Sequence, residues 1–101
     1  MTMASALKMA IRRRGTHDIP LRQLGVLFLV HEAISFGDRE VRTLGRDLDM
    51  RQQAVSRAAD GLERLGFVRR VDDEVDGRLV LLEMTTEGKL FIKRFLEEVG
   101  R

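Results

Sequence analysis

The hydrophobic pattern of this chain changes its period twice, and this change restricts the fold more than any other feature of the sequence. Up to about residue 66, apolar residues recur at the three- and four-residue spacing of helices. Phe67–Asp72 and Arg78–Met84 are instead short runs rich in apolar and β-branched residues, and Asp76-Gly77 between them is a hairpin turn signal. A helical period returns after Thr85. The pattern therefore predicts a mainly α-helical chain with a small β-hairpin, which is an α+β fold.

Turn and cap residues divide the helical part into separate helices. Asp18 is a candidate N-cap with Pro20 near the first turn, Asp49-Met50 is a tight turn, and Gly66 ends the helix before the hairpin. The predicted elements are helices at 4–14, 21–34, 43–48, 51–65 and 86–99, an extended piece at 39–41, and the two hairpin strands. A helix pair joined by a tight turn and followed at once by a two-stranded ribbon is the layout of a winged helix-turn-helix.

The length of 101 residues fits one domain. We predict a single winged helix domain over residues 1–101, with a three-helix core, a wing and terminal helices. Its predicted parts are an N-terminal helix at 1–15, the helix-turn-helix at 43–66, the wing at 67–84 and a C-terminal helix at 86–99. In such units the second helix of the pair enters the DNA major groove.

The residue types present argue against catalysis and against bound metals or cofactors. The chain has no cysteine, which excludes disulfides and thiolate metal sites. His17 and His31 are its two histidines, and neither belongs to a cluster with metal-ligand spacing. There is no glycine-rich phosphate loop and no nucleophile with a plausible base. We therefore expect no enzyme activity, no metal and no cofactor.

Charge and hydropathy indicate whether the chain can bind DNA or a membrane. The net charge is only +2, so a case for DNA binding depends on where the arginines lie. The apolar stretch Val26–Val30 is far too short to span a bilayer. The basic residues near the N-terminus are not followed by the apolar run of a signal peptide. We expect no membrane association and a cytoplasmic location.

The helix predicted at 51–65 has two distinct faces on a helical wheel. Its apolar side contains Val55, Ala58, Ala59, Leu62 and Leu65. The opposite side contains Gln53, Arg57, Asp60 and Arg64, with Gln52 and Ser56 beside them. Gln and Arg donate paired hydrogen bonds to base edges, although a solvated surface has the same composition. Asp60 repels phosphate unless Arg57 or Arg64 neutralises it, so we expect bases to meet the N-terminal half only.

Two further features have both a functional and a structural interpretation. Gly45 lies inside a predicted helix, where it lets the helix pair cross closely or is merely tolerated. Strand alternation places Arg69 and Arg70 on opposite faces of the hairpin. Asp76 can orient an arginine and leave Arg78 pointing outward, while the alternative is a solvated, charge-balanced hairpin.

Several motifs together resemble the MarR family of bacterial transcription regulators. They are Leu44–Met50, Val55–Arg57, Leu62–Val68, Asp76–Arg78 and Thr85–Gly88, and the resemblance covers Ile19 to Leu96. It implies a recognition helix in the major groove, a wing arginine in the minor groove, and a dimer formed by terminal helices. The implied DNA-binding residues are Gln52, Gln53, Ser56, Arg57 and Arg78. Arg51 stands where the family usually has a capping residue, and we expect it to meet a phosphate.

The sequence therefore predicts a sequence-specific regulator that binds double-stranded DNA. Two alternatives stay open, namely a protein-interaction module with the same fold and a non-specific architectural or replication-associated DNA binder. Leu7 and Ile11, with Phe91, Phe95 and Val99, would suit a homodimer interface, or these helices simply complete the core of one chain. The sequence gives no sign of a small-molecule effector.

Overall fold

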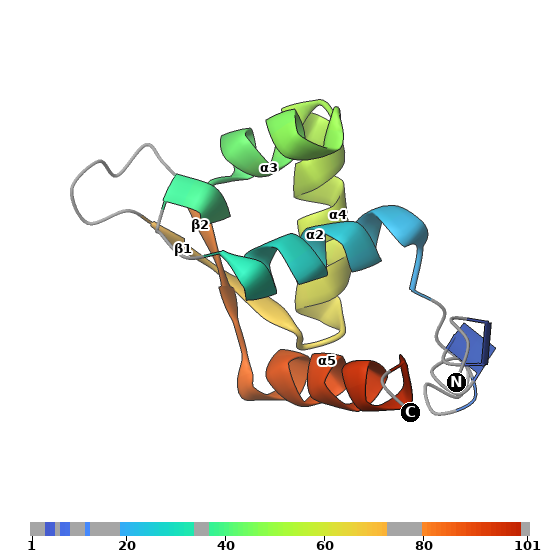
Figure 1. The fold of residues 1–101 in the computed structure, drawn as a ribbon. Coiled ribbons are helices and arrows are strands. Elements are labelled where there is room, and N and C mark those ends of the chain that lie inside the picture. Colours follow the sequence, from blue (N-terminus) through green and yellow to red (C-terminus); the bar gives the residue numbers. More distant parts are fainter. Residues whose placement is uncertain are drawn as a thin grey trace.

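The computed structural model describes residues 4–5, 7–8, 12, 19–33, 37–72 and 80–99, without the side chains of residues 98 and 99. Its elements are helix α2 (Leu21–Glu32), the short 3-10 helix η1 (Gly37–Arg39), helices α3 (Val41–Leu48) and α4 (Gln52–Arg64), strands β1 (Val68–Asp72) and β2 (Val80–Met84), and helix α5 (Thr86–Val99). Figure 1 shows α3 at one end of α4, α5 at the other end, α2 crossing between them, and the hairpin along one side. This arrangement is the predicted winged helix-turn-helix.

The core lies where α2, α3 and α4 meet the hairpin and α5. The apolar side of α4 supplies Val55, Ala58, Ala59 and Leu62, all buried, as the helical wheel predicted, while Leu65 is half-buried. Further buried core residues from the other elements are Val26, Leu27, Val30, Leu44, Val68, Leu82 and Ile92. Because α4 packs this side against the core, its opposite side is the one that can meet a partner.

Gly45 and Asp49 form the turn that joins α3 to α4. Asp49 ends α3 in the left-handed conformation with φ 52°, and the amide of Met50 donates to the carbonyl of Gly45 at 2.7 Å. A Cβ on residue 45 would lie 2.7 Å from the Met50 carbonyl oxygen and 3.4 Å from Val55 Cγ2. The close approach predicted for Gly45 is therefore confirmed, because a side chain there would separate the two helices.

The extended piece predicted at 39–41 is wrong except at one residue. Arg39 belongs to η1, Val41 begins α3, and only Glu40 makes an isolated antiparallel bridge, with Leu81. The amide of Glu40 closes the turn on Gly37 at 3.2 Å, and its carbonyl accepts the Leu44 amide at 2.9 Å. Because η1 ends at Arg39 and α3 begins at Val41, Glu40 is the single residue with extended backbone between them.

Four predicted helix boundaries shift by one or two residues, including the end of α4, which is at Arg64 rather than Leu65. Helix α2 ends at Glu32 because Ala33 adopts an extended conformation, while the predicted end at residue 34 lies outside the described residues. Helix α3 begins at Val41, two residues earlier than predicted. Arg51 is not the first residue of α4 but its N-cap, with extended backbone and no side-chain cap hydrogen bond.

The strands pair in antiparallel register from Val68 opposite Met84 to Asp72 opposite Val80. Thr85 then caps α5, since its hydroxyl oxygen Oγ1 accepts the Gly88 amide at 3.0 Å. The same hydroxyl donates to the Gly66 carbonyl at 2.5 Å. Thr85 is therefore the N-cap of α5. The hairpin tip, including the predicted Asp76-Gly77 turn, lies outside the described residues.

Candidate nucleic-acid interface

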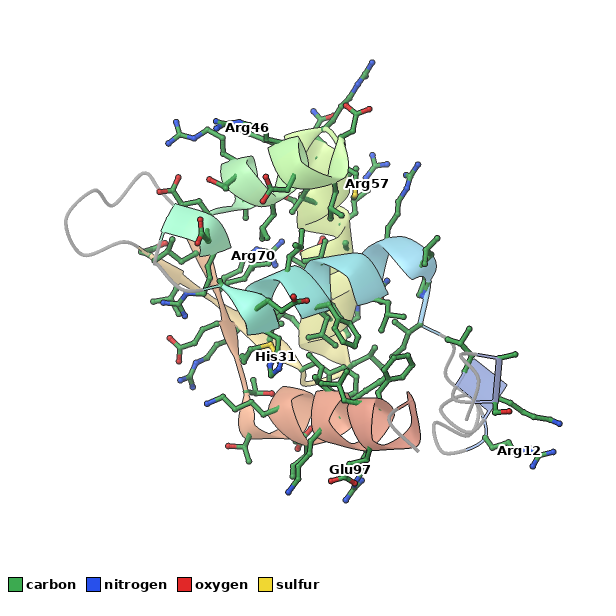
Figure 2. The ribbon with its side chains drawn as sticks, viewed as in Figure 1. Arg12, His31, Arg46, Arg57, Arg70 and Glu97 are labelled. Carbon is green, nitrogen blue, oxygen red and sulfur yellow. The ribbon has the colours of Figure 1, made fainter. Side chains whose placement is uncertain are left out.

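The N-terminal half of α4 presents most of the predicted site residues together. Arg51, Gln52, Gln53 and Arg57 are exposed, and no hydrogen bond or ion pair joins their side chains to another described residue. Figure 2 shows Arg57 on α4 at the end of the molecule where α3 carries Arg46. These donors remain available to an incoming ligand. Of the other two predicted residues, Arg78 lies outside the described part of the chain, and Ser56 is described below.

Ser56 occupies a different flank of α4 from Gln53 and Arg57. It is half-buried and, with Gln52 and Arg70, lines a hollow of about 330 Å³ beside the hairpin. Its carbonyl oxygen accepts a hydrogen bond from Arg70 Nη2 at 2.8 Å. Ser56 therefore borders the exposed face of α4 on its hairpin side.

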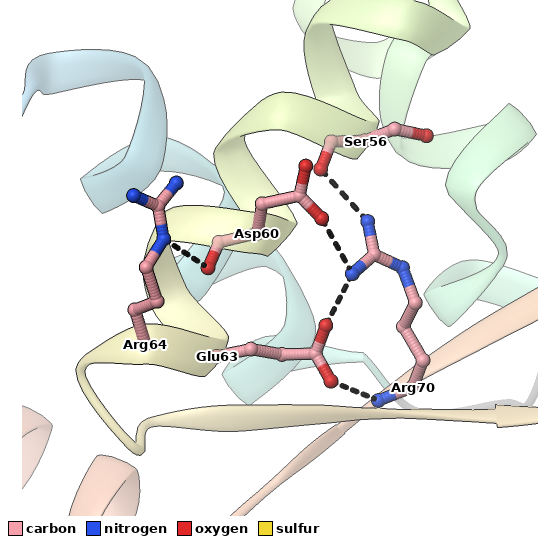
Figure 3. Close-up of polar contacts among 5 residues, drawn as sticks. All are labelled: Ser56, Asp60, Glu63, Arg64 and Arg70. Atoms are coloured by element: carbon pink, nitrogen blue, oxygen red, sulfur yellow. Dashed lines mark hydrogen bonds and ion pairs between the residues drawn. The ribbon is translucent and has the colours of Figure 1, made fainter.

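Asp60 is neutralised by Arg70, a residue of β1 that the sequence did not suggest for this role. Arg70 Nη1 lies 2.9 Å from Asp60 Oδ1 and also pairs with Glu63 Oε1 (Figure 3). The Arg70 amide donates to Glu63 Oε2 at 3.3 Å. The expected partner Arg64 instead donates through Nε to the carbonyl of Asp60 at 3.4 Å. The C-terminal half of α4 is thus tied to the hairpin, while its N-terminal half is open.

A second hollow, of about 330 Å³, lies on the flank of α4 that faces α2. Arg22 of α2 lines it together with Arg51 and Arg57. Its other lining residues are Asp49, Met50, Gln53 and Ala54. The sequence did not identify Arg22 as a site residue, because most of α2 and all of α3 lie between it and Arg51 in the chain. Arg22 comes close to α4 only when the chain folds.

A comparison with known protein families agrees with this geometry. Residues 17–79, more than half of the chain, match the model of the MarR family. The chain belongs to the MarR family. Over 77 residues it is 29% identical to the uncharacterized HTH-type transcriptional regulator YhbI of Bacillus subtilis. That match covers 76% of this chain and 48% of YhbI, so this MarR-family chain spans about half the length of the curated relative.

Solved structures show the same fold. The transcriptional regulator Tm0710 from Thermotoga maritima superposes with a TM-score of 0.80 at 21% identity, covering 97% of this chain and 64% of that one. A mutant of S. aureus MepR bound to an oligodeoxyribonucleotide gives a TM-score of 0.74 at 21% identity, covering 93% of this chain and 67% of that one. YhbI and Tm0710 are both named as transcriptional regulators, in agreement with the sequence-based expectation.

In this MarR-family chain, α5 contributes more aromatic side chains to the core of the single chain than the dimer interpretation assumed. Phe95 is buried, and its ring packs edge-to-face against the ring of Phe28 with 5.4 Å between the two ring centroids. The rings of Phe91 and Phe67 pack in the same way, with 4.9 Å between their centroids. Exposed apolar surface on α5 comes instead from Leu90 and Leu96, exposed by 45% and 46%. Ile11 and the side chain of Val99 lie outside the description, whereas Leu7 is exposed.

A further ion pair lies on the solvent side of the hairpin. Arg69 Nε donates to Glu83 Oε1 at 3.2 Å, and this hydrogen bond with the nearby charge lowers the pKa of the Glu83 carboxyl below its usual value. Arg69 and Arg70 thus point to opposite faces, as strand alternation predicted. Within the described ranges, no group of three or more His, Asp or Glu could hold a metal ion, and no helix is long and apolar enough to cross a membrane.

Proposed function

We propose that this MarR-family chain is a sequence-specific regulator that reads double-stranded DNA through the N-terminal half of α4. The observation that carries the proposal is the group of exposed donors on that half-helix, with Gln53 and Arg57 at its centre, which pair with no other described residue. Arginine and glutamine form paired hydrogen bonds with guanine and adenine edges in the major groove. The MepR structure bound to an oligodeoxyribonucleotide supports the proposal, because it has the same fold.

The other predicted residues take secondary roles in this proposal. Gln52 and Ser56 border the base-reading face on the hairpin side, and Arg51 at the N-cap meets a backbone phosphate. Arg78 in the hairpin tip enters the minor groove. Contact ends before Asp60, because the ion pair between Asp60 and Arg70 ties that part of α4 to the hairpin.

A homodimer completes the proposal. Leu90 and Leu96 on α5, with Leu7 near the N-terminus, are large exposed apolar residues of the kind that two-fold interfaces bury. A two-fold dimer would place its recognition helices about 34 Å apart and would favour palindromic sites. The cytoplasm, where bacterial DNA lies, is the proposed location.

The test is a selection of duplexes from a random pool by the purified chain at two salt concentrations, followed by affinity measurements on the enriched site. Arg57→Ala is expected to cost about 1–3 kcal/mol on that site, which is about 5- to 150-fold in affinity. Arg94→Ala is the matched control, since Arg94 is an exposed arginine on α5 and the same charge is lost.

Each other result contradicts the proposal in a distinct way. An unchanged affinity for Arg57→Ala would show that α4 reads DNA through other residues. Salt-sensitive retention without an enriched site would indicate a non-specific architectural binder. No retention at either salt concentration would leave the protein-interaction module as the function.

A further inference from the structure

The hollow between α2 and α4 collects three arginines from two separate helices. Arg22 belongs to the first turn of α2, Arg51 is the N-cap of α4, and Arg57 lies two turns further along α4. One carboxylate, that of Asp49, lines the same hollow. Three guanidinium groups against one carboxylate give the hollow an excess of positive charge, so its natural occupant is an anion.

These arginines differ from those on the hairpin side because their charge is not compensated within the described residues. Arg70 pairs with Asp60 and Glu63, Arg69 with Glu83, and Arg42 with Glu40 at 3.1 Å. Arg22, Arg51 and Arg57 have no such carboxylate partner in the described part of the chain. The charge of α4 is therefore neutralised on its hairpin flank and left available on its α2 flank.

The N-terminal end of α4, which lines this hollow, adds to its positive character. Neither α2 nor α4 has a side-chain cap hydrogen bond at its N-terminus, and neither has an acidic residue in its first turn. Uncapped amides and the helix dipole both favour an anion at such ends. Since Arg51, Gln53 and Ala54 at the end of α4 line the hollow, the backbone contribution of α4 acts at the same place as the arginine charges.

The position of the hollow selects a DNA phosphate among possible anions. A helix that enters the major groove has a sugar-phosphate backbone on each side of it. One flank of α4 is occupied by the hairpin, and the other flank is this hollow, directly beside Gln53 and Arg57. A groove wall that passes α4 on the α2 side would bring a phosphate against Arg22 and Arg51.

We propose that Arg22 and Arg51 form a cradle for one backbone phosphate, which fixes the register of α4 in the groove without reading a base. This inference deepens the proposed function and depends on it for the orientation of α4. It assigns a DNA contact to α2, a helix outside the helix-turn-helix pair. Arg57 lines both the cradle and the base-reading face, so it links the two kinds of contact.

The experiment measures the affinity of the full chain and its Arg22→Ala variant for the selected duplex and for a random duplex at several salt concentrations. Loss of one phosphate contact is expected to reduce the slope of log affinity against log salt by about 0.9 for each bound chain. Affinity should fall by a similar factor for both duplexes, so the preference between them stays unchanged. Arg22→Lys should recover much of the slope, because a point charge still binds phosphate.

Arg94→Ala is again the matched control and should leave the slope unchanged. Circular dichroism establishes that each variant is folded, and Arg22→Gln replaces Arg22→Ala if the alanine variant is not. An unchanged slope for the folded Arg22 variant would overturn the cradle. A loss confined to the selected duplex would also overturn it, because that result marks a base contact.

The outcome separates the cradle from the proposed function. A wild-type chain that binds both duplexes equally, with a slope that Arg22→Ala reduces, would refute sequence-specific reading and support the cradle. A chain with a clear preference and no dependence on Arg22 would do the reverse. A chain that binds neither duplex would overturn both proposals.

Discussion

Arg70 on β1 lies 2.9 Å from Asp60 on α4, measured from Nη1 to Oδ1, and its second terminal nitrogen donates to the carbonyl of Ser56. One side chain thereby joins two turns of α4 to the first strand of the hairpin. The contact combines charge with directed hydrogen bonds and is partly shielded from water, since the side chain of Arg70 is only 30% exposed. The hairpin is therefore held at a defined position along α4.

Replacement of Arg70 by Met should lower the free energy of unfolding by about 1–3 kcal/mol, because hydrogen bonds to charged groups are lost and Asp60 and Glu63 keep their charge. Urea unfolding measures the change. Arg69→Met is the matched control on the same strand, where the Arg69 side chain is 64% exposed and the expected loss is at most about 1 kcal/mol. Equal losses in the two variants would show that Arg70 contributes no more than an ordinary surface pair.

Two glycines allow a direct test of the close approach between α3 and the turn that follows it. Gly45→Ala should lower the free energy of unfolding by about 1–3 kcal/mol, since its Cβ would press on the Met50 carbonyl oxygen. Gly25→Ala should instead be neutral or stabilising by up to about 1 kcal/mol, because its Cβ would lie 3.6 Å from Leu48 Cδ2 and alanine favours a helix. Thermal unfolding of both variants checks the opposite signs, and a stabilised Gly45→Ala would refute the steric argument.

The Thr85 hydroxyl is expected to contribute as a helix cap. Thr85→Ala should cost about 1 kcal/mol of stability, within the range of about 0.5–2 kcal/mol that caps contribute. Thr85→Ser keeps the hydroxyl and should retain most of this contribution. If urea unfolding gives the same loss for both variants, the Thr85 methyl group rather than its hydroxyl is responsible.

The lowered pKa of the Glu83 carboxyl predicts a weak dependence of the free energy of unfolding on pH. Its pKa is lowered in the folded state by the hydrogen bond and charge of Arg69, so the stabilisation is present above the usual glutamate pKa of about 4.3 and is lost as the pH falls through the lower, folded value. Wild type should therefore be slightly more stable than Glu83→Gln near neutral pH, and the difference should vanish in acid. Unfolding midpoints at several pH values measure it, and a difference that grows in acid would contradict the assigned cause.

The local sequence pattern was sufficient to predict those structural features that depend on residues close together in the chain. The period of α4 predicted its buried side, and alternation in β1 separated Arg69 from Arg70. Pattern was not sufficient for contacts that folding creates between distant segments. The partner of Asp60 comes from the next element, and Arg22 reaches α4 only because α2 crosses it.

The two phenylalanines of α5 show a related limit. A helical period indicates that Phe91 and Phe95 share an apolar side, but it does not say which surface covers that side. In the folded chain Phe28 and Phe67 cover it, which leaves Leu90 and Leu96 exposed. Assignment of apolar residues to a core or to an interface needs the positions of the other helices.

The junction at Thr85 makes the two ends of the molecule mechanically dependent on each other. Its hydroxyl is bonded both to the carbonyl of Gly66, just beyond α4, and to the first turn of α5. Gly88 leaves no room for a side chain against the Phe67 carbonyl, so the backbones are in direct contact there. A tilt of α5 that preserves these bonds must carry the C-terminal end of α4 with it, so the orientations of α5 and α4 are coupled through Thr85.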